Sequence, residues 1–408
     1  MSEWREVELG DLVDIFDHKR VPLSSAQRAT RQGPYPYYGA QGIIDHIDEF
    51  IFDGRYILVP EDGENLRSRK LPIAYFADGQ FWVNNHAHIV RAKAGIANDR
   101  FVQSAIEASH IGAYITGAAQ PKLSQANLRQ IRLGVPSLSV QNVIAAFLDD
   151  LDDLIENNRR RVEVLEEMAR AIYREWFVHF RYPGHERVAI VDSPLGLIPE
   201  GWRLSTCGDE LTALGGGTPS KKEPSYWDGG TVPWFTPSDL TKSRSRFTAE
   251  SELCITEEGV ARSSARRFPV GSVLMTSRAT LGVLAIATAE ATTNQGFIVI
   301  PPDDRWAPGF IYEWLEAQAD ELASIATGAT FKEITKGAFR RVPFLVPAQA
   351  ILDAHRERIA GIEQQIHTLE QATINLVALR DLLLPKLVTG QIDVSSLDLD
   401  AVMEGSLA

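Results

Sequence analysis

The chain contains one stretch twice: residues 116–136 read TGAAQPKLSQANLRQIRLGVP, and residues 327–347 read TGATFKEITKGAFRRVPFLVP. Thr-Gly-Ala opens both copies and Val-Pro closes both, at an offset of 211 residues (116 to 327). Trp-Arg, followed by Gly-Asp, begins at Trp4 and again at Trp202, at an offset of 198 residues (4 to 202). A long helical pattern follows each Val-Pro. The order is therefore globular unit, helix, globular unit, helix, and such a duplication gives two similar binding surfaces joined by a spacer.

The first helical pattern has an unbroken seam at alternating spacings of four and three residues, which is typical of a coiled coil. Its members are Ile144, Leu148, Leu151, Ile155, Asn158, Val162, Leu165, Ala169, Ile172 and Trp176. Asn158 is the one polar member, and it either fixes the register of a buried pairing or lies at an exposed contact. The second pattern comprises Ile359, Ile362, Ile366, Leu369, Leu376, Leu379 and Leu383. We expect Pro385 to end this helix, and the two helices to pair antiparallel and hold the globular units apart.

Short apolar runs separated by glycines predict that each globular unit is mixed and mostly β. These runs are residues 43–44, 56–59, 72–76, 272–276, 281–287 and 297–300, and residues 306–326 have helical spacing. The predicted fold class is therefore α+β: two similar β-rich domains, each followed by a long helix, with the helices paired as an antiparallel coiled coil. The predicted segments are globular units at 1–136 and 199–347, helices at 137–180 and 348–392, a Pro- and Gly-rich connector at 181–198, and a loose acidic tail at 393–408.

The composition of the 408 residues, 44% of them hydrophobic, suits two or more folded domains. The N-terminus is polar, and no stretch approaches the ~18 apolar residues of a membrane span. The two cysteines, Cys207 and Cys254, cannot make a disulfide framework or a four-ligand zinc site. We therefore expect a cytoplasmic protein with no membrane contact.

The net charge of −13 argues against a polyanionic partner until its distribution is considered. Lys and Arg minus Asp and Glu gives −1 for residues 1–136 and −3 for residues 199–347, and the helical segments and tail carry −9. Each globular unit is nearly neutral, and each can present one basic face. We expect the affinity of the chain alone for DNA to be modest, because neutralised phosphates supply much of such affinity.

No catalytic pattern is complete. The chain lacks the Asn/Asp-Pro-Pro-aromatic loop and the Gly-rich cofactor loop of an adenine methyltransferase. Residues 215–222 resemble a phosphate loop in composition only, because the glycine before the lysine is missing and Pro219 removes a backbone donor. Asp17-His18-Lys19 has the spacing of a nuclease motif without a matching upstream acid. His86 and His88, two apart on a probable strand, face the same side; without a third ligand they are polar surface or nucleic-acid contacts rather than a metal site.

The candidate DNA contacts are polar, basic and aromatic residues on probable loops. Contacts to phosphates position a protein on DNA, and contacts to base edges specify the sequence; Asn side chains, for example, suit bidentate adenine recognition. For each residue alone a solvated surface is the default interpretation, and Arg278 or Asn85 can instead pair internally and hold a loop. The candidates in the first unit are Tyr37, Tyr38, Arg67, Arg69, Lys70, Asn84, Asn85, His86 and Lys122, and those in the second are Thr218, Ser220, Lys221, Lys222, Ser277, Arg278, Asn294, Gln295 and Lys332.

Several short motifs follow one another in a specific order on this repeat. The first half contains Tyr35–Ala40, Trp82–His88, Lys122–Ser124 and Trp176-Phe177, and the second contains Gly216–Ser220, Pro233-Trp234, Asp239-Leu240, Thr293–Gly296 and Leu384–Ile392. Through these motifs the chain resembles, over essentially its whole length, the specificity subunit of Type I restriction–modification systems. The globular units diverge strongly between their shared ends, as that family predicts if each unit reads a different half-site, so contacts do not transfer from one unit to the other residue by residue.

The resemblance implies that each globular unit is a target recognition domain for one half of a split, asymmetric DNA sequence, and that the paired helices set the gap. It implies two methyltransferase (modification) subunits that dock on the helices and methylate adenine N6 with S-adenosylmethionine, and restriction/translocase subunits that use ATP and Mg²⁺. The chain itself would be non-catalytic, with no cofactor or metal of its own. The alternative is a two-headed protein-interaction scaffold, whose heads should expose an aromatic or aliphatic patch.

Overall fold

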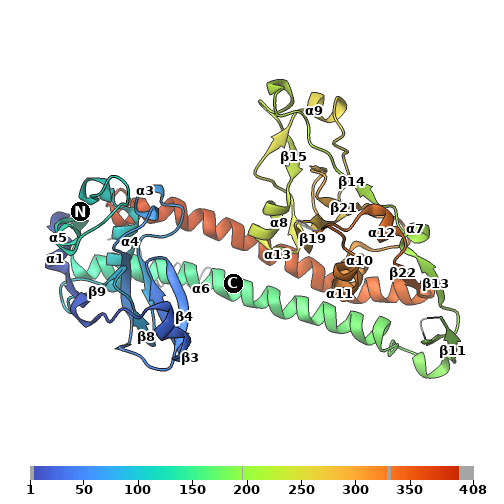
Figure 1. Cartoon of the computed structure of the whole chain (residues 1–408), viewed down its shortest axis with the longest axis horizontal. Helices are drawn as coiled ribbons and strands as arrows, with labels where there is room; N and C mark the ends of the chain where they lie inside the picture. Colours follow the sequence, from blue (N-terminus) through green and yellow to red (C-terminus); the bar gives the residue numbers. More distant parts are fainter. Residues whose placement is uncertain (1–3, 195, 329–331, 395–408) are drawn as a thin grey trace. The chain divides into compact units, whose positions relative to one another are not determined.

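The computed structural model describes residues 4–194, 196–328 and 332–394 and contains two compact units (Figure 1). Unit 1 comprises residues 1–156 and 375–408, and unit 2 comprises residues 157–374. Each unit is a mixed, β-rich globule that includes part of both long helices, so the predicted fold class is confirmed. Among the described residues, no helix is long and apolar enough to cross a membrane.

Unit 1 is built from short strands and helices. Its strands are β1 (Arg5–Glu8), β2 (Val13–Ile15), β3 (Gln32–Gly39), β4 (Gly42–Ile47), β5 (Phe52–Asp53), β6 (Tyr56–Pro60), β7 (Tyr75–Ala77), β8 (Gln80–Val83), β9 (Ala87–Ala92) and β10 (Arg132–Val135). Its short helices are α1 (Leu9–Leu12), α2 (Ser25–Ala29), α3 (Asn65–Ser68), α4 (Asp99–Ala108) and α5 (Gln125–Gln130), with 3-10 turns at Asp17–Lys19 and Ile111–Tyr114. One sheet has the order β2-β9-β6-β7, another the order β4-β3-β8-β5, and β1 pairs with β10.

Unit 2 is organised in the same way. Its strands are β13 (Arg203–Thr206), β14 (Leu214–Gly215), β15 (Val232–Phe235), β16 (Phe247–Thr248), β17 (Cys254–Ile255), β18 (Val273–Arg278), β19 (Thr280–Ala287), β20 (Thr292–Thr293), β21 (Phe297–Ile300) and β22 (Pro343–Val346). Its short helices are α7 (Cys207–Glu210), α8 (Pro237–Ser243), α9 (Glu257–Ala261), α10 (Pro308–Ala317), α11 (Ala319–Ser324) and α12 (Lys336–Arg340), with a 3-10 turn at Pro224–Tyr226. The sheets have the orders β14-β21-β18-β19-β16 and β17-β15-β20, and β13 pairs with β22.

The segments outside the globular parts are the connector and the long helices. The connector contains a 3-10 turn at His185–Arg187 and a hairpin of β11 (Ile190–Ser193) with β12 (Gly196–Pro199). The long helices are α6 (Leu138–Tyr173), continued by a π-helical turn at Arg174–Val178, and α13 (Gln349–Val388).

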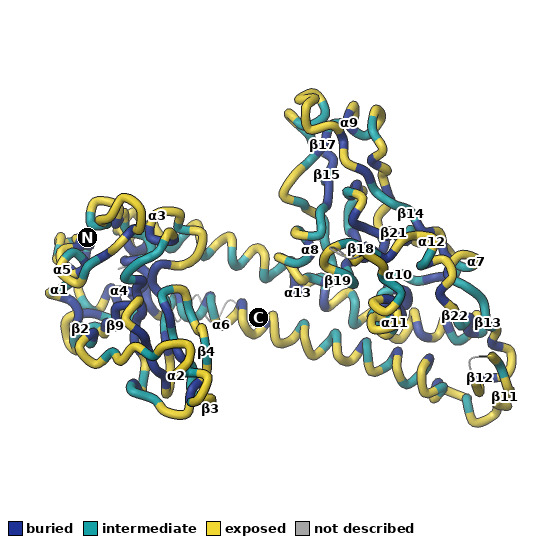
Figure 2. The backbone as a smooth tube through the Cα atoms, in the orientation of Figure 1, coloured by how far each residue is buried: buried dark blue, intermediate teal, exposed yellow. Residues whose placement is uncertain are grey.

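The core of unit 1 forms where α4 packs on the β2-β9-β6-β7 sheet. The side chain of Asn98 caps α4 by accepting a hydrogen bond from Phe101 N. Phe101 is completely buried in the same apolar cluster as Ile57 of β6 and Val90 of β9. In Figure 2 the strands of both units are largely dark and the loops are largely yellow, so the exposed polar residues gather on the connections.

The repeated sequence at the ends of the two units corresponds to one repeated structure. β1 pairs with β10 so that Arg5 lies opposite Val135, and β13 pairs with β22 so that Arg203 lies opposite Val346. Gly10 of α1 and Gly208 of α7 lie where a Cβ atom would be 3.0 Å from the Cβ of Arg129 and of Arg340. A residue without a side chain lets α1 approach α5, and α7 approach α12, this closely. The conserved spacing of Gly and Arg between the two halves is therefore one helix contact made twice.

The two long helices pair antiparallel within each unit. In unit 1, Leu148 of α6 and Leu387 of α13 belong to one buried cluster, so the beginning of α6 lies against the end of α13. In unit 2, Tyr173 of α6 and Leu352 of α13 belong to one cluster, so the end of α6 lies against the beginning of α13. The antiparallel pairing expected from the seam pattern is thus present.

Most of the predicted seam residues are buried or half-buried, but Leu379 is 42% exposed, so its assignment to the seam is wrong. Buried members are Ile144, Leu148, Leu151, Ile155, Ile359, Ile366 and Leu369, and half-buried members are Val162, Leu165, Ile362 and Leu376. Asn158 is 9% exposed, so of the two interpretations of this residue the buried one holds. Its role in fixing the register stays a prediction.

Two expectations about the end of the chain are wrong. α13 continues through Pro385 to Val388, because Leu387 and Val388 are buried in the core of unit 1 and hold the last turn in place. Pro385 therefore removes one backbone hydrogen bond without ending the helix. The tail was expected to be loose from residue 393, but Val394 is 4% exposed within the same core. The remainder of the predicted tail, residues 395–408, lies outside the described residues.

A buried ion cluster joins the β-rich part of unit 2 to α13. Arg246, 1% exposed, donates through Nη1 to Glu313 of α10 at 2.6 Å and through Nη2 to Glu363 of α13 at 3.2 Å. Glu370 of α13 accepts the backbone N–H groups of Arg246 and Phe247. Burial raises the pKa of Glu370 to about 7 although these hydrogen bonds oppose the change. Removing the guanidinium would leave buried carboxyl groups without their partner, a loss that costs about 3–5 kcal/mol in comparable pairs.

His355 of α13 is a buried histidine inside an aromatic cage. It is 0% exposed, and its ring makes edge contacts with Tyr173, Trp176, Phe177 and Phe310. Neither ring nitrogen has a hydrogen-bond partner among the described residues. Burial lowers the pKa of His355 to about 4.

We predict that His355→Ile stabilises the protein. The 211-residue offset aligns His355 with Ile144, which is also 0% exposed, so the same position in unit 1 already accepts isoleucine. Removing an unsatisfied buried polar group should raise the free energy of unfolding by about 1–3 kcal/mol, measured by urea unfolding at pH 7.5. The reciprocal variant Ile144→His should lower it, and a destabilised His355→Ile protein would contradict the prediction.

The pH dependence of protein stability gives an independent check of the burial of His355. Because the folded pKa of about 4 lies below the ordinary value of 6.5, the unfolded chain binds a proton between these pH values that the folded chain does not. The wild type should therefore lose stability as the pH falls from 6.5 to 4, by up to about 3 kcal/mol from this group. His355→Ile should lack this contribution, and identical pH profiles for the two proteins would contradict it.

Candidate nucleic-acid interface

In unit 1 the candidate residues gather around the turn between β8 and β9. Asn84 closes this turn: its Oδ1 accepts a hydrogen bond from His86 N at 2.8 Å, and its backbone N–H donates to Tyr38 O at 3.0 Å. An Asn side chain that bonds the backbone two residues on is a common way to stabilise a turn. Asn84 is consequently 7% exposed, whereas Asn85 and His86 project into solvent.

Charged side chains of both signs surround this turn. His86 Nδ1 lies 2.8 Å from Asp62 Oδ2. Glu61 accepts a hydrogen bond from Arg20 Nη1 at 2.7 Å and lies 3.3 Å from Lys122 Nζ. Burial raises the pKa of Glu61, but the Arg20 hydrogen bond and neighbouring positive charges outweigh it, and the net pKa is lowered. Glu61 is therefore a carboxylate at neutral pH that ties Arg20 and Lys122 to the rim of the turn.

His88 lies beneath the turn and not on its surface, which corrects the expectation that it shares an exposed face with His86. It is 0% exposed; its Nδ1 lies 2.6 Å from Asp17 Oδ2 and its Nε2 lies 2.8 Å from Leu123 O. His88 thus fastens β9 to the Asp17–Lys19 turn through Nδ1 and to the segment that carries Lys122 through Nε2. Among the described residues, no group of three or more His, Cys, Asp or Glu side chains could hold a metal ion.

Unit 2 has the same turn between β20 and β21. Asn294 Oδ1 accepts a hydrogen bond from Gly296 N at 2.8 Å, and Asn294 N donates to Phe235 O at 2.9 Å. Thr218 Oγ1 donates to Gln295 Oε1 at 2.7 Å. Beside the turn, Arg278 Nη2 lies 2.9 Å from both carboxylate oxygens of Glu333. The structure therefore brings together four candidate segments that are up to 114 residues apart in sequence (218 to 332).

The Gly-rich segment of unit 2 is explained by this turn. A Cβ atom on Gly216 would lie 2.1 Å from Thr293 O, and one on Gly217 would lie 2.1 Å from Ser264 Oγ. Glycine is required at both positions so that the loop carrying Thr218 can lie directly on the turn. The resemblance to a phosphate loop is thus a consequence of close backbone packing.

Four candidates, Tyr37, Arg69, Asn84 and Ser277, are buried or half-buried, which corrects their assignment as exposed DNA contacts, whereas Arg67 is exposed but bonded to the backbone. Tyr37 is 0% exposed and its hydroxyl accepts a hydrogen bond from Leu23 N. Ser277 is 2% exposed within β18, which extends further than expected, and Asn84 closes its turn. Arg67 donates to the backbone carbonyl groups of Gly117 and Ala118. Arg69 donates to those of Glu107 and Ser109. Each of these side chains is held by partners that the local sequence pattern did not reveal.

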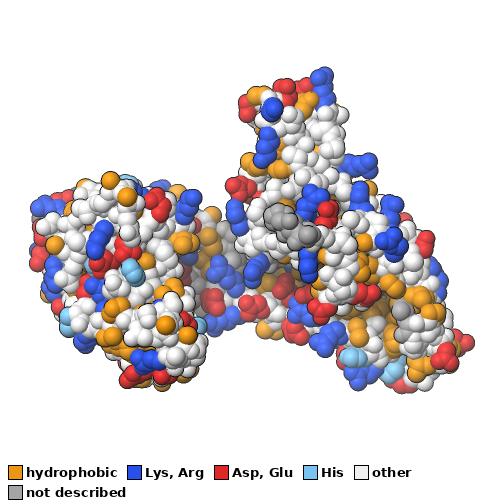
Figure 3. All heavy atoms as spheres, viewed as in Figure 1, with side chains coloured by type: hydrophobic (Ala, Val, Ile, Leu, Met, Phe, Trp, Pro, Cys, Tyr) orange, Lys and Arg blue, Asp and Glu red, His pale blue; other side chains and the backbone are white. Residues whose placement is uncertain are grey.

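The remaining candidates keep surface positions. Tyr38 and Asn294 are half-buried, and Tyr38 packs edge-on against Phe81. The exposed candidates are Arg67, Lys70, Asn85, His86, Lys122, Thr218, Ser220, Lys221, Lys222, Gln295 and Lys332, while the Arg278 side chain is 43% exposed. Figure 3 shows Lys and Arg side chains on the part of unit 2 that carries α9 and β15, and also acidic side chains beside them. Whether any of these residues contacts DNA stays a prediction.

Sequence reasoning missed Arg20, Glu61, Asp62 and Glu333. The 211-residue offset aligns Lys122 with Glu333, and the structure places both in the same bridge, opposite Thr116 and Thr327 respectively. That signal was available in the sequence, whereas Lys332 is one residue away from the equivalent position. Nothing in the local sequence links Arg20 or Glu61 to a turn more than 20 residues further along the chain.

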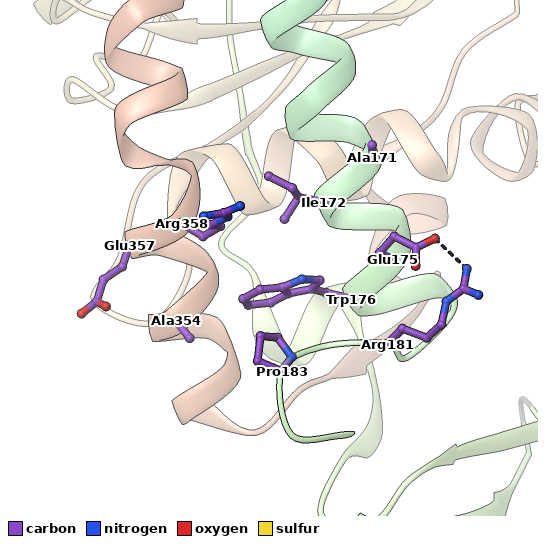
Figure 4. Close-up of a pocket in the computed structure, with 9 residues that line it drawn as sticks. All are labelled: Ala171, Ile172, Glu175, Trp176, Arg181, Pro183, Ala354, Glu357 and Arg358. Carbon is purple, nitrogen blue, oxygen red and sulfur yellow. Dashed lines mark hydrogen bonds and ion pairs between the residues drawn. The ribbon is translucent and has the colours of Figure 1, made fainter. Parts of the chain in front are cut away.

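A separate hollow lies on the helix pair in unit 2. It has a volume of about 700 Å³ and is lined by residues of α6, the π-helical turn, the connector and α13. Figure 4 shows the Trp176 ring between the two helices, with Arg181 paired to Glu175 at its edge. Glu357 and Arg358 of α13 lie on the opposite side. The rim of this hollow therefore carries charges of both signs from both helices and the connector.

The chemistry of the two turns is hydrogen bonding, not bond breaking. Each turn presents an amide side chain, Asn85 or Gln295, next to an ion pair, and the polar side chains come from separate loops on a rigid sheet edge. Amide, guanidinium and carboxylate groups match the donor and acceptor patterns of base edges. The ion pairs differ between the units, so the two surfaces are not interchangeable.

Comparison with known proteins matches most of the chain to one family. The family model described as "Type I restriction modification DNA specificity domain" matches residues 1–167 and again residues 199–377. The MjaIX Type I restriction enzyme specificity subunit of Methanocaldococcus jannaschii is 34% identical over 194 residues, which is 45% of this chain and 45% of that protein. The chain thus spans less than half of that relative. The HindI specificity subunit of Haemophilus influenzae is 20% identical over an alignment that covers 96% of this chain and all of that one.

The fold is also found among solved structures. The S subunit of a Type I restriction-modification system from M. genitalium has a TM-score of 0.61 with this chain at 14% sequence identity. The alignment covers 95% of this chain and 96% of that one. At this identity the similarity shows a shared fold.

Proposed function

The chain belongs to the Type I restriction–modification DNA specificity family, and we propose that it reads a split, asymmetric DNA sequence, one half with each unit. Recognition of DNA sequence is the role of this family, and the catalytic activities of Type I systems reside in partner subunits. The observation that carries the proposal is the pair of equivalent turns, Asn84–His86 and Asn294–Gly296, which share a backbone frame and carry different side chains. Two turns with equivalent hydrogen bonds and different exposed side chains fit a DNA target whose two halves differ.

The long helices support a spacer between the half-sites. α6 and α13 each contribute to both units, and their antiparallel pairing gives each unit a helical base. In unit 2 the Arg246 cluster fixes the β-rich part to α13. We infer that the helices determine the number of unread base pairs, and that the exposed helix surface near Trp176 is available to a modification subunit.

The partners supply the reaction in this proposal. Two methyltransferase subunits methylate adenine N6 with S-adenosylmethionine, and restriction/translocase subunits use ATP and Mg²⁺ to cleave unmodified DNA. Such a complex acts on DNA in the cytoplasm. A two-headed protein-interaction scaffold is not favoured, because the turns present polar and charged groups where a protein-binding head would expose an apolar patch.

We predict that sequence-specific binding requires the assembled complex. The globular segments carry −1 and −3, and the helical segments and tail carry −9, so the chain alone neutralises few phosphates. Selection from a random duplex library should yield a split sequence with the chain bound to its methyltransferase subunits, and weak or no selection with the chain alone. Tight, selective binding by the isolated chain at physiological salt would contradict this, and no selection by the complex would contradict the proposed function.

A further inference from the structure

The two units place residues of opposite charge at the same position beside the turn. Glu61 N donates to His86 O, and Ser277 N donates to Gly296 O. Leu123 N donates to Glu61 O, and Ile334 N donates to Ser277 O. Glu61 and Ser277 are therefore equivalent by their backbone hydrogen bonds, and so are the residues that follow them, Asp62 and Arg278.

The residues across from this position are also reversed in charge. Asp62 forms an antiparallel bridge with Lys122, and Arg278 forms the equivalent bridge with Glu333. An acid faces a base in unit 1, and a base faces an acid in unit 2. Across this backbone bridge only Arg278 and Glu333 pair by their side chains, whereas Asp62 pairs with His86 and Lys122 pairs with Glu61. The shared frame therefore does not depend on one ion pair, and the reversed charge fits two units that read different bases.

The chemistry of the two residues selects opposite base edges. Arg278 has N–H donors only, and guanine offers two acceptors, O6 and N7, in the major groove. The carboxylate of Asp62 offers acceptors only, and cytosine and adenine offer an exocyclic amino donor there. The same position thus suits guanine in one unit and an amino-bearing base in the other.

Both side chains are accessible and their present partners can be exchanged. The Arg278 and Glu333 side chains are 43% and 34% exposed, and His86, the partner of Asp62, is 47% exposed. Exposed ion pairs contribute about 0–1 kcal/mol, so replacing such a partner by a base has a small cost. The Asp62 side chain is 19% exposed and one of its oxygens is bound to His86, which leaves a narrower approach in unit 1.

The backbone on both sides of Arg278 is irregular. The register between β18 and β19 shifts between Met275 and Ser277, which marks a bulge just before Arg278. Ala279, the next residue, has φ 64°, in the left-handed region that non-glycine residues rarely adopt. Bulges and strained residues often re-aim a functional side chain at the end of a strand.

We propose that Asp62 and Arg278 are equivalent base-selecting residues, with Arg278 donating to a guanine of the second half-site and Asp62 accepting from the amino group of a cytosine or adenine in the first. This inference rests on the proposed function. His86 and Glu333 hold the two side chains in place before DNA is bound.

The test uses the chain assembled with its methyltransferase subunits and measures methylation kcat/KM on duplexes carrying single substitutions in the wild-type motif. Arg278→Ala should lose discrimination at one guanine of the second half-site, roughly 5- to 160-fold for a bidentate contact of about 1–3 kcal/mol. Asp62→Ala should lose discrimination between bases at one position of the first half-site. In each variant the other half-site should be read as before.

Two further variants separate reading from structural support. Arg305→Ala removes a guanidinium of similar exposure, 37%, from a pair with Glu210 outside the turn, and should leave discrimination intact. Glu333→Gln frees Arg278 and should retain the guanine preference. The inference is overturned if Arg278→Ala keeps its discrimination or weakens all positions equally with a lower Tm, or if Glu333→Gln loses the guanine preference while Arg278 is present. If the wild-type complex reads no defined sequence, the proposed function fails instead.

Discussion

Replacing residues 200–347 with the corresponding unit of a relative should change one half of the recognised sequence completely and leave the other half unchanged. The reason is that the readers of unit 2 lie on a frame closed by its own strand pair, β13 with β22. Asp62 and Asn85 lie on unit 1, whose sheet pairings involve no strand of unit 2. The measurement is the methylated motif of cells that express the chimera with the wild-type methyltransferase.

The ends of the exchanged segment matter for the design. Both strands of the β13–β22 pair must come from the donor, so the junctions belong before Arg203 and after Val346. The donor must also carry an arginine where this chain has Arg246, because Glu363, which accepts a hydrogen bond from Arg246 Nη2, remains on α13. A donor without it is the matched control: it should fail to fold or assemble. If both halves of the motif change together in a folded chimera, the modular account is wrong.

Lengthening both helices by one heptad should widen the gap between the half-sites or abolish activity. A heptad adds about 10.5 Å, which corresponds to roughly three base pairs at about 3.4 Å each. Contacts at Asp152–Arg380 and Trp176–His355 place Asn158 opposite Ile374. Insertions after Asn158 and near Ile374 therefore keep both seams in phase.

The single insertion is the control for this experiment. A heptad inserted in α6 alone shifts the seam residues of α6 along an unchanged α13. The single insertion should therefore abolish assembly or activity. The double insertion should either methylate a motif with a longer gap or lose activity, because three base pairs also turn the second half-site around the duplex. An active double variant with an unchanged gap would show that the helices do not set the spacing.

The sequence predicted the parts of this fold that depend on local periodicity. The seam from Ile144 to Leu165 gave a helix because its spacing is a property of consecutive turns. The Gly and Arg repeat predicted two similar units, and the structure added the α1–α5 and α7–α12 contacts. Pro385 misled because burial of Leu387 outweighs the single hydrogen bond that proline removes.

The candidate surface was predicted less well because it depends on partners far away in sequence. Tyr37 and Ser277 have polar groups that suit a surface, but β3 and β18 turn them inward. Arg278 was considered either a reader or an internal partner, and the structure pairs it with Glu333, 55 residues on, at 43% exposure. This pairing leaves both interpretations to experiment, since an exposed pair can open at little cost.

The most direct test of the account is sequencing of N6-methyladenine across the genome of cells with and without this gene, its methyltransferase partner being present in both. The account predicts one asymmetric motif, two short defined halves separated by a fixed number of unread base pairs, that is methylated only when the gene is present. The same methylation pattern in both cells, or a gene-dependent motif without a gap, would contradict it.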